Sequence, residues 1–366
     1  MNSTILTAKE LSVGYGDKVV VDGLGFEVSR GEILTVIGPN GAGKSTILKS
    51  IAAQLPRLSG TVCIGDRDIA SMSLNDIART LSLCLTERIT AEKMTCEDIV
   101  STGRYPYTGR LGILSDDDRS IVREAMELTG TTPLADTDIR FISDGQRQTV
   151  MLARAIAQQP QILILDEPTS FLDINNKLRL LNILTELVRS RNIAVIQTLH
   201  ELDLAQRFSD KILCIRDNRA DRIGTPEEIF SGDYISKLYG ITNGTFDPLS
   251  GTAEAQKVIG APKVFVIGGG GGAIHTYRSL QRQGIPFAAG VIHENDVEYR
   301  IAGSLAAELI TEKAFEPISD SSIERALSVM NKCEKVICCV EHFGTMNMGN
   351  RKLLEAYSSR QDGHIV

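Results

Sequence analysis

Apolar residues in the first 257 positions fall into two patterns, short continuous runs and runs with helical spacing. Continuous runs at 162–165 and 194–198 predict buried strands, and the segment at 174–190 predicts a helix between them. A polar region with helical spacing covers about 75–155. Strands that alternate with helices predict a mostly parallel sheet with both faces covered, so we expect an α/β fold.

The same kind of pattern starts again after a break. Residues 241–262 are rich in Gly, Thr, Asn, Asp and Pro, which is typical of a connecting segment. A new apolar run then opens at 263 with KVFVIGGGGGAI. The remaining pattern predicts a helix up to Gln283, further helices at about 298–310 and 321–332, and strands at 287–292 and 335–340.

These patterns predict two domains of unequal size. The first covers 1–257 and includes a helical subdomain at about 86–155. The second is a small α/β domain at 263–357. A linker at 258–262 joins the two, and a tail at 358–366 follows.

Composition and charge exclude several classes of protein. The chain has 366 residues and a formal net charge of −7, which argues against nucleic acid or an anionic membrane as the main partner. No run approaches the roughly 18 apolar residues that a spanning helix needs. The first ten residues lack the pattern of a secretory signal. We therefore expect a soluble, intracellular protein whose seven scattered cysteines remain free thiols.

A glycine-rich segment follows the apolar run that ends at Ile37. It reads GPNGAGKS and fits the pattern G-x-x-x-x-G-K-[ST], in which backbone N–H groups surround phosphate oxygens at the start of a helix. Lys44 would reach the β- and γ-phosphates of a nucleotide, and Ser45 would bind Mg²⁺. The candidate ATP-binding residues here are Gly38, Pro39, Asn40, Gly41, Ala42, Gly43, Lys44, Ser45 and Thr46.

Two carboxylates follow the predicted strand at 162–165. Asp166 suits the coordination shell of Mg²⁺, and Glu167 suits a base that polarises an attacking water. An acidic pair could also simply end a strand before Pro168, but that reading does not account for the glycine-rich segment.

Five motifs along the chain resemble those of the ATP-binding subunit of an ABC transporter. GPNGAGKST and ILILDEP are similar to the Walker A and Walker B motifs. ISDGQ at 142–146 resembles the LSGGQ signature, and SFLD at 170–173 resembles the D-loop. His200 stands where the family has its switch histidine, and Tyr15 where it stacks an aromatic ring on adenine. The resemblance covers about 1–257.

The resemblance implies a fold and a mechanism. The fold is the ABC-type nucleotide-binding domain of the P-loop NTPases, with a β-subdomain, a RecA-like core and a helical subdomain. ATP and Mg²⁺ are the expected cofactors, Glu167 and His200 the catalytic residues, and the working form is a homodimer with two ATP molecules between its chains. The residues expected to contact the ATP of the other chain are Ser143, Asp144, Gly145, Gln146 and Asp173.

The sequence departs from the family pattern at one important place. The family has a glutamine about forty residues after Walker A, but alignment on the Ala-Arg pair of IARTLSLCLTERIT puts Leu85 and Thr86 there. Thr86 or Glu87 could supply the oxygen ligand for Mg²⁺ instead, unless the alignment is out of register. Asp144 in the signature and Phe171 in the D-loop are milder departures.

The stretch GRYPYTG and the segment around the signature look most like the subfamily that energises uptake of iron–siderophore complexes, haem or cobalamin. That likeness implies two transmembrane permease subunits, an indirect link to a substrate-binding protein and a place at the cytoplasmic face of the membrane. Tyr105 and Tyr107 could contact a permease or pack within the helical subdomain. The alternative is a soluble ABC-type ATPase that acts on nucleic acid or ribosomes. Such proteins usually carry two cassettes and basic stretches, which this acidic chain lacks.

The second domain opens with a weaker glycine motif. G-x-G-x-x-A, formed by Gly268, Gly270 and Ala273, directly follows an apolar run, which suggests a Rossmann-type phosphate turn. Acidic residues follow at Glu294 and Asp296. The domain could be a sensor for a nucleotide or a transported metabolite, or a structural or dimerising appendage; a dinucleotide oxidoreductase is poorly supported. The histidines here have spacings that match no known metal site, which favours solvated or capping roles: His275, His293 and His342.

Overall fold

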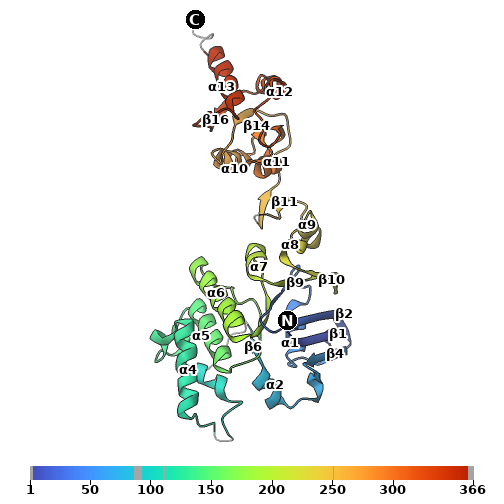
Figure 1. Cartoon of the computed structure of the whole chain (residues 1–366), viewed down its shortest axis with the longest axis vertical. Coiled ribbons are helices and arrows are strands. Elements are labelled where there is room, and N and C mark those ends of the chain that lie inside the picture. Colours follow the sequence, from blue (N-terminus) through green and yellow to red (C-terminus); the bar gives the residue numbers. More distant parts are fainter. Residues whose placement is uncertain (1–2, 86–92, 110–111, 250, 362–366) are drawn as a thin grey trace. The chain divides into compact units, whose positions relative to one another are not determined.

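The computed structural model describes residues 3–85, 93–109, 112–249 and 251–361. The chain divides into two compact units, Met1–Tyr239 and Gly240–Val366 (Figure 1). Among the described residues, no helix is long and apolar enough to cross a membrane.

The first unit is built on a ten-stranded sheet with the order β5-β4-β1-β2-β10-β9-β3-β8-β7-β6. Strands β9, β3, β8, β7 and β6 run parallel to one another. Antiparallel pairs join β9 to β10 and β1 to both β2 and β4. The strands are β1 (Thr4–Tyr15), β2 (Lys18–Ser29), β3 (Ile33–Ile37), β4 (Arg57–Ile64), β5 (Arg67–Asp68), β6 (Leu81–Cys84), β7 (Ile162–Leu165), β8 (Ala194–Thr198), β9 (Lys211–Arg216) and β10 (Arg219–Gly224).

The parallel part of this sheet carries the predicted buried strands. Every residue of β3, β7 and β8 is buried, as expected for strands covered on both faces. Their carboxyl ends lie at one edge, which brings the segments after Ile37, Leu165 and Thr198 together. The helices associated with the sheet are α1 (Lys44–Ile51), α2 (Leu74–Thr80), α6 (Ile174–Arg191), α7 (Leu202–Phe208), α8 (Pro226–Ile229) and α9 (Tyr234–Tyr239).

Three further helices form the helical subdomain: α3 (Cys96–Ser101), α4 (Asp116–Thr129) and α5 (Asp144–Ala157). Helices α3 and α4 both pack against α5. Ser115 begins α4 with a capping box, because its hydroxyl accepts the Asp118 N–H while the Asp118 carboxylate accepts the Ser115 N–H. The predicted helical region at 75–155 also contains strand β6, whose four residues are too few to interrupt a helical pattern visibly.

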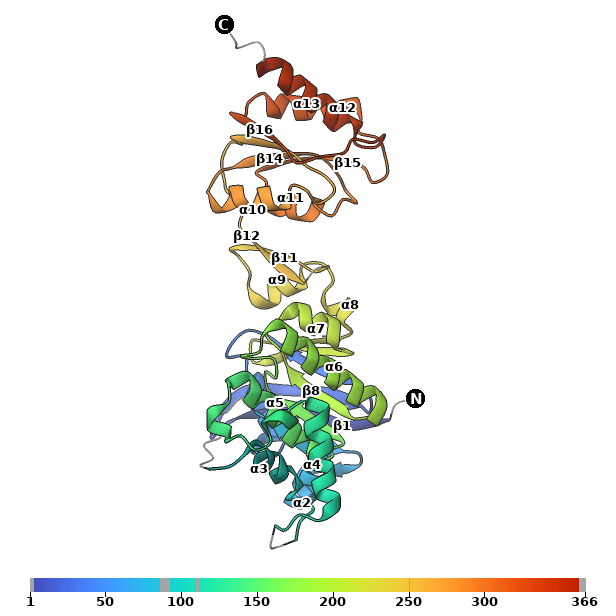
Figure 2. The same cartoon turned by 90° about the vertical axis from the view of Figure 1, so that its left-hand side faces the viewer.

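The second unit has a four-stranded, all-parallel sheet with the order β15-β14-β13-β16. Figure 2 shows α10 and α11 on one face and α12 and α13 on the other, and each pair covers its own apolar cluster. The elements are β11 (Gly244–Asp247), β12 (Thr252–Ala255), β13 (Val264–Ile267), α10 (Ile274–Arg282), β14 (Phe287–His293), α11 (Tyr299–Leu305), β15 (Glu308–Glu312), α12 (Asp320–Met330), β16 (Lys335–Cys338) and α13 (Met348–Gln361).

Strand order in this sheet locates a switch point. The chain passes from β13 outward through β14 to β15 and then returns to place β16 on the other side of β13. In open parallel sheets, ligands bind outside the carboxyl ends of the strands at such a reversal. The glycine-rich segment that starts at Gly268 follows β13 directly and therefore lies at this position.

Three features differ from the sequence prediction. The unit boundary follows Tyr239 instead of residue 257, because the β11–β12 hairpin packs on α11 and Arg278 pairs with Glu254 of the hairpin. The helix predicted at 298–310 ends at Leu305, and strand β15 follows it. The Ala307 N–H donates to the Phe287 carbonyl of β14, so the chain joins the sheet just before β15 begins. Helix α13 extends past 357 into the predicted tail.

Candidate functional site

The loop between β3 and α1 is shaped by its glycines. Gly38, Gly41 and Gly43 have φ angles of 153°, 81° and 93°, in the region that side chains disfavour. A Cβ on Gly38 would lie 2.4 Å from the Ile215 carbonyl oxygen, and one on Gly43 would lie 2.5 Å from Val21 Cγ2. The loop can therefore take this course only with glycine at these two positions.

Lys44 is held inside this loop. Its Nζ donates to the carbonyl oxygens of Gly38 at 2.8 Å and of Pro39 at 3.1 Å. Burial lowers the pKa of Lys44, and the nearby carboxylates of Glu167 and Asp166 counteract that effect. The ammonium group thus stands at the loop interior, where phosphate oxygens can replace the two carbonyls.

Asp166 and Glu167 follow β7 at the same edge of the sheet and are tied to β8. Thr198 Oγ1 donates to Asp166 Oδ1 at 2.7 Å and accepts the backbone N–H of Glu167 at 2.8 Å. One hydroxyl at the end of β8 therefore fixes both the orientation of the Asp166 carboxylate and the start of the Glu167 loop. The sequence carried no separate signal for Thr198, whose role depends on strand register.

Glu167, a residue predicted to be catalytic, has a partner at each carboxylate oxygen. Its Oε1 contacts His200 Nε2, and its Oε2 accepts a hydrogen bond from Ser170 Oγ at 3.1 Å. Glu167 itself has a left-handed φ of 49°, which turns the chain sharply after the strand. The structure thus brings together the two residues predicted to be catalytic, and adds Ser170.

Tyr239 is a further residue at the loop that sequence reasoning missed. Its hydroxyl accepts the backbone N–H of Gly38 at 3.2 Å, and burial raises its pKa to about 12, so it stays protonated. Tyr15, the predicted adenine contact, is half exposed at the end of β1. Ser45 and Thr46 lie in the first turn of α1, with Thr46 buried.

The residues predicted to act on the other chain's ATP line a separate cavity of about 700 Å³. Ser143 caps α5 with a capping box, in which the Gln146 N–H donates to its hydroxyl at 3.2 Å. A Cβ on Gly145 would lie 3.2 Å from Leu172 Cδ2, so the signature packs closely on the D-loop. Asp173, also at this cavity, caps α6.

This cavity contains none of the residues of the glycine-rich loop at 38–46. The signature and the nucleotide loop of one chain therefore do not form a single closed site. Asp144 pairs with Arg147 at 2.6 Å, and Phe171 projects into solvent with 77% of its surface exposed. Thr86 and Glu87, the candidates for the missing glutamine, lie outside the described residues.

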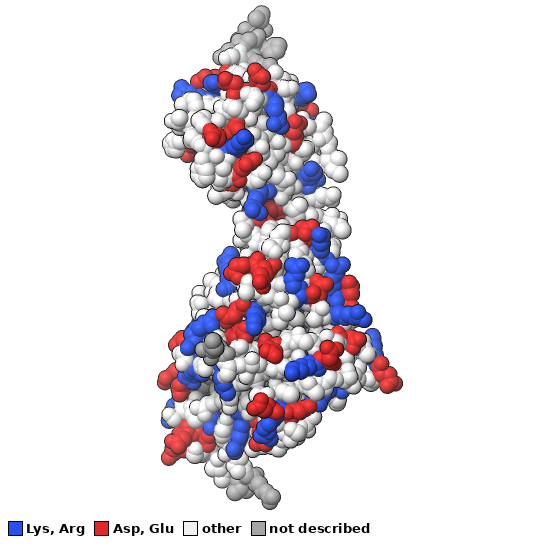
Figure 3. All heavy atoms as spheres, turned by 45° about the vertical axis from the view of Figure 1, so that its right-hand side comes forward, with Lys and Arg blue, Asp and Glu red and all other residues white. Residues whose placement is uncertain are grey.

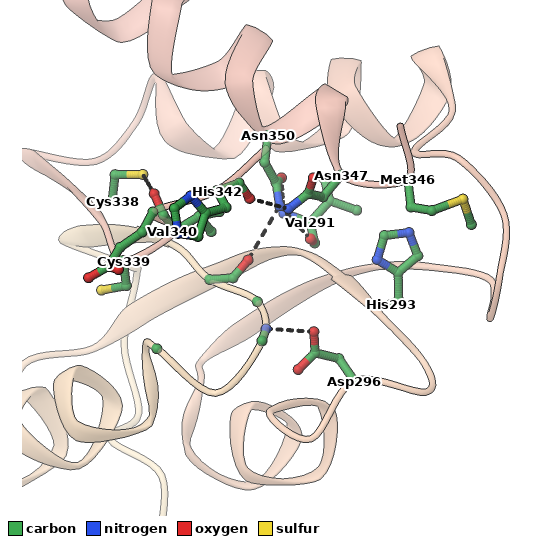
Figure 4. A pocket seen from close by; sticks show the side chains of 15 residues that line it. Val291, His293, Asp296, Cys338, Cys339, Val340, His342, Met346, Asn347 and Asn350 are labelled. Atoms are coloured by element: carbon green, nitrogen blue, oxygen red, sulfur yellow. Dashed lines mark hydrogen bonds between the residues drawn. The ribbon is translucent and has the colours of Figure 1, made fainter. Parts of the chain in front are cut away.

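The second glycine loop borders a cavity of about 770 Å³ at the carboxyl ends of β13, β14 and β16 (Figure 4). Gly268 and Gly270 line it, whereas Ala273 is the fully buried N-cap residue that precedes α10. The Gly270 N–H donates to Asp296 Oδ2 at 2.8 Å, and the Ala273 N–H donates to Glu298 Oε1 at 2.7 Å. Carboxylates thus accept hydrogen bonds from the two amides that a phosphate would use.

Comparison with known proteins identifies the two units separately. The family pattern described as ABC transporter matches residues 21–170, and the pattern of the MJ0874 family matches residues 287–366. An uncharacterized ABC transporter ATP-binding protein of Methanocaldococcus jannaschii, MJ0873, is 40% identical over 277 residues, which are 75% of this chain and 96% of that protein.

Two further matches come from transporters of stated class. The cobalamin import ATP-binding protein BtuD of Halobacterium salinarum is 30% identical over 324 residues, 86% of this chain and 81% of that protein. A solved structure assigned to a metal-chelate type ABC transporter, in an inward-facing conformation, is 25% identical with a TM-score of 0.57 and covers 64% of this chain and 89% of that one. The chain therefore belongs to the ABC transporter ATP-binding proteins and is an ABC transporter ATPase.

Proposed function

We propose that this chain is the ATP-hydrolysing subunit of an importer for a metal chelate, either an iron complex such as a siderophore or haem, or cobalamin. Two similarities support this cargo class: the cobalamin importer subunit and the metal-chelate type transporter. The GRYPYTG stretch of the helical subdomain adds a likeness to the same subfamily.

The observation that carries the ATPase role is the Glu167–His200 contact at the edge of the sheet that also holds Lys44. Lys44 and the loop amides would bind the β- and γ-phosphates. Glu167 would polarise the attacking water, while His200 would hold Glu167 and hydrogen-bond the γ-phosphate. Ser170 positions the second oxygen of the Glu167 carboxylate.

Asp166 and Ser45 would hold Mg²⁺ beside the phosphates. Thr198 fixes Oδ1 of Asp166, so the carboxylate presents its other oxygen in a defined direction. Hard oxygen ligands of this kind suit Mg²⁺, which would neutralise charge on the transferred phosphoryl group.

The separate cavity at Ser143 supports a homodimer. One chain supplies the phosphate loop, and its partner would supply residues Ser143–Gln146 and Asp173 to cover the same ATP. The start of α5 is the positive end of a helix dipole, which favours a phosphate oxygen there. Binding of ATP between two chains would close the dimer, and hydrolysis would release it.

Of the two tyrosines in the GRYPYTG stretch, only Tyr105 is exposed and could contact a permease. Tyr107 is used internally, because its hydroxyl donates to the Gln158 carbonyl at 3.1 Å and the Arg104 guanidinium stacks on its ring. Tyr105 instead exposes 59% of its surface. We place this surface against one of two permease subunits at the cytoplasmic side of the membrane, with a substrate-binding protein linked only through them.

The charge distribution favours protein partners over nucleic acid. In the face shown in Figure 3, basic and acidic side chains are interspersed and form no broad basic surface. A nucleic-acid interface needs clustered Lys and Arg to displace counterions from phosphates.

The test uses Glu167→Gln, with the exposed Glu27→Gln on β2 as a matched control. We expect E167Q to bind ATP, to lose roughly 10²–10⁴-fold in turnover, as for loss of a general base, and to form an ATP-dependent dimer in light scattering. In cells that carry E167Q, uptake of radiolabelled cobalamin or of a labelled iron complex should stop. Unchanged uptake of all these chelates in cells whose protein has lost turnover would refute the import function.

A further inference from the structure

The signature segment carries a charge of the same sign as the ligand proposed for it. Asp144 stands in the first turn of α5, and it lines the cavity of about 700 Å³ beside Ser143 and Gly145. The proposed homodimer brings the γ-phosphate of the partner's ATP to this cavity. A carboxylate repels a phosphate at such a partly exposed site, so Asp144 opposes the binding that the segment is expected to perform.

The other charged residues of the cavity do not offset this repulsion. Among the described residues that line it, Arg179 is the one cation and Asp173 is a second carboxylate. The Arg179 guanidinium lies against Gly130, the C-cap residue of α4, where a Cβ would come within 1.8 Å of Arg179 Nη2. The cavity therefore has two carboxylates and one guanidinium, and that guanidinium is held at the end of α4.

Asp144 also competes with a phosphate for the positive end of α5. The peptide dipoles of a helix sum to a partial positive charge at its N-terminus, which stabilises an anion there. In this chain the Asp144 carboxylate belongs to the first turn and already uses that charge. A second anion binds favourably at the same helix end when a cation compensates the first.

Arg147 supplies a compensating charge from the next turn of α5. Residues three apart share a helix face, and side chains lean towards the N-terminus, so Arg147 reaches back to Asp144. Its Nη1 donates to Asp144 Oδ1 at 2.6 Å, and its Nη2 donates to the backbone carbonyl of Ile139 at 3.3 Å. Only 20% of the Arg147 side chain is exposed. The guanidinium is thus held in a defined place beside the carboxylate.

Arg147 is placed to neutralise Asp144 rather than to bind the ligand. Asp144 is one of the residues that line the cavity, whereas Arg147 is not. In a single chain, an ion pair whose carboxylate is 45% exposed contributes little to stability. Once a second chain covers the cavity and displaces water, an uncompensated carboxylate becomes costly. The pair therefore matters most in the ATP-bound dimer.

We propose that Arg147 is a positioning residue of the ATP site between two chains: it neutralises Asp144, so that Ser143 and the start of α5 can accept the phosphate. Arg147 acts through Asp144 and makes no contact with the nucleotide. This inference rests on the proposed homodimer, in which the signature faces the ATP of another chain. The effect of Arg147 is then on association of the chains, and not on binding of ATP to the loop at 38–46 of the same chain.

The test measures association of the full-length protein by sedimentation equilibrium with saturating ATP and Mg²⁺. All variants also carry Glu167→Gln, which keeps ATP from being consumed. Arg147→Ala should raise the dissociation constant of the ATP-bound dimer roughly tenfold or more, as removal of one partner of a desolvated charge pair does. The increase should be smaller at high salt, which screens the carboxylate. Arg147→Lys keeps the charge and should restore most of the affinity.

A double-mutant cycle separates neutralisation from direct contact. Asp144→Asn removes the charge with little change in shape, and should leave the dimer at least as tight as the parent. Arg147→Ala added to Asp144→Asn should have no further effect, because no carboxylate remains to be neutralised. Arg351→Ala, which breaks the Arg351–Glu355 pair of the second unit, is the matched control and should leave association unchanged.

Binding of a fluorescent ATP analogue to dilute, monomeric protein should be equal in all variants. Arg147→Gln replaces R147A if thermal unfolding shows that R147A is misfolded. Equal weakening by R147A with and without the Asp144 carboxylate would overturn the proposal, because Arg147 would then contact the nucleotide or the partner itself. A dimer unaffected by R147A would overturn it as well. Failure of E167Q itself to associate with ATP would refute the homodimer, and this inference with it.

Discussion

The two glycine-rich loops of this chain look alike in sequence and differ in what surrounds them. Each follows a fully buried strand and leads into a helix, β3 to α1 in the first unit and β13 to α10 in the second. The first loop encloses an ammonium group, that of Lys44. In the second loop, backbone N–H groups donate hydrogen bonds to the carboxylates of Asp296 and Glu298. A strand–glycine–helix pattern therefore specifies a backbone shape, and neighbouring charges decide which ligand that shape suits.

The glycines also serve different ends in the two loops. Gly41 has a φ of 81°, and a Cβ at this position would have no other atom within 4 Å. Glycine is therefore needed here for its backbone angle, and the space beside it is open to a ligand. A Cβ on Gly268 would lie 2.2 Å from Tyr277 Oη and 2.5 Å from Glu298 Oε2. Gly268 is thus required by packing against a buried hydrogen-bonded pair.

The strongest test of this contrast removes the positive charge from the first loop. Lys44→Ala should lower ATP turnover by about 10²–10³-fold, in the range seen when one electrostatic contact to the transition state is lost. Steady-state phosphate release measures this, with Lys9→Ala on β1 as an exposed control. Retained turnover in K44A would mean that the loop amides suffice and that the charge difference between the loops is unimportant.

The second test removes the negative charge from the second loop. Glu298→Ala should destabilise the second unit by about 2–4 kcal/mol, because the Ala273 N–H and the Tyr277 hydroxyl would be left buried without a partner. Burial raises the pKa of Tyr277, so its hydroxyl donates to Glu298 at 2.9 Å. Tyr277→Phe removes that one bond and should cost about 1 kcal/mol. Calorimetry of the unfolding transition would record both, and equal midpoints for E298A and wild type would contradict the structural role.

A paired substitution separates packing from ligand access. Gly268→Ala should destabilise the second unit by about 1–3 kcal/mol, as overpacking does. Gly41→Ala should cost only about 1 kcal/mol through its left-handed φ, and should show its effect chiefly as weaker ATP binding. Thermal unfolding and nucleotide titration of both variants provide the measurements. A G268A protein as stable as G41A would show that Tyr277 and Glu298 move aside.

The smallest effect concerns Glu312, the last residue of β15 in the second unit. Hydrogen bonds from Ser319 hold the pKa of Glu312 at about 2, below its usual value. The stabilisation is present above the ordinary glutamate pKa and is lost as pH falls towards 2. Ser319→Ala, which also removes the cap of α12, should cost about 1 kcal/mol at pH 7, and less as acid protonates Glu312. Urea unfolding across pH 2–7 checks this; a constant difference would exclude Glu312 from the effect.

The candidate ATP-site residues lie together because parallel strands place their carboxyl ends at one edge of the sheet. The loop at 38–46, Asp166–Glu167 and His200 each follow such a strand, so their meeting could be predicted from order alone. The sequence prediction missed strand β15, which has only five residues. Ala306 and Ala307 precede it and extend the helical pattern of α11 into the strand. The bond between Tyr239 and Gly38 joins residues 201 positions apart and left no local signal.

The second glycine motif shows the limit of pattern reading more clearly. Gly268, Gly270 and Ala273 predict the turn, which the structure contains. Nothing in that pattern indicates that Asp296 and Glu298, 26 and 25 residues beyond their amide donors, accept its N–H groups. The charge of a site depends on side chains brought in by tertiary packing, and a motif of backbone residues does not encode it.

Tyr239 has a consequence for communication along the chain. It is the last residue of the first unit, and the residue after it begins the second. The same tyrosine holds the amide of Gly38 at the entrance to the nucleotide loop. One peptide bond and one phenol therefore separate the first residue of the second unit from the backbone of Gly38 in the glycine-rich loop.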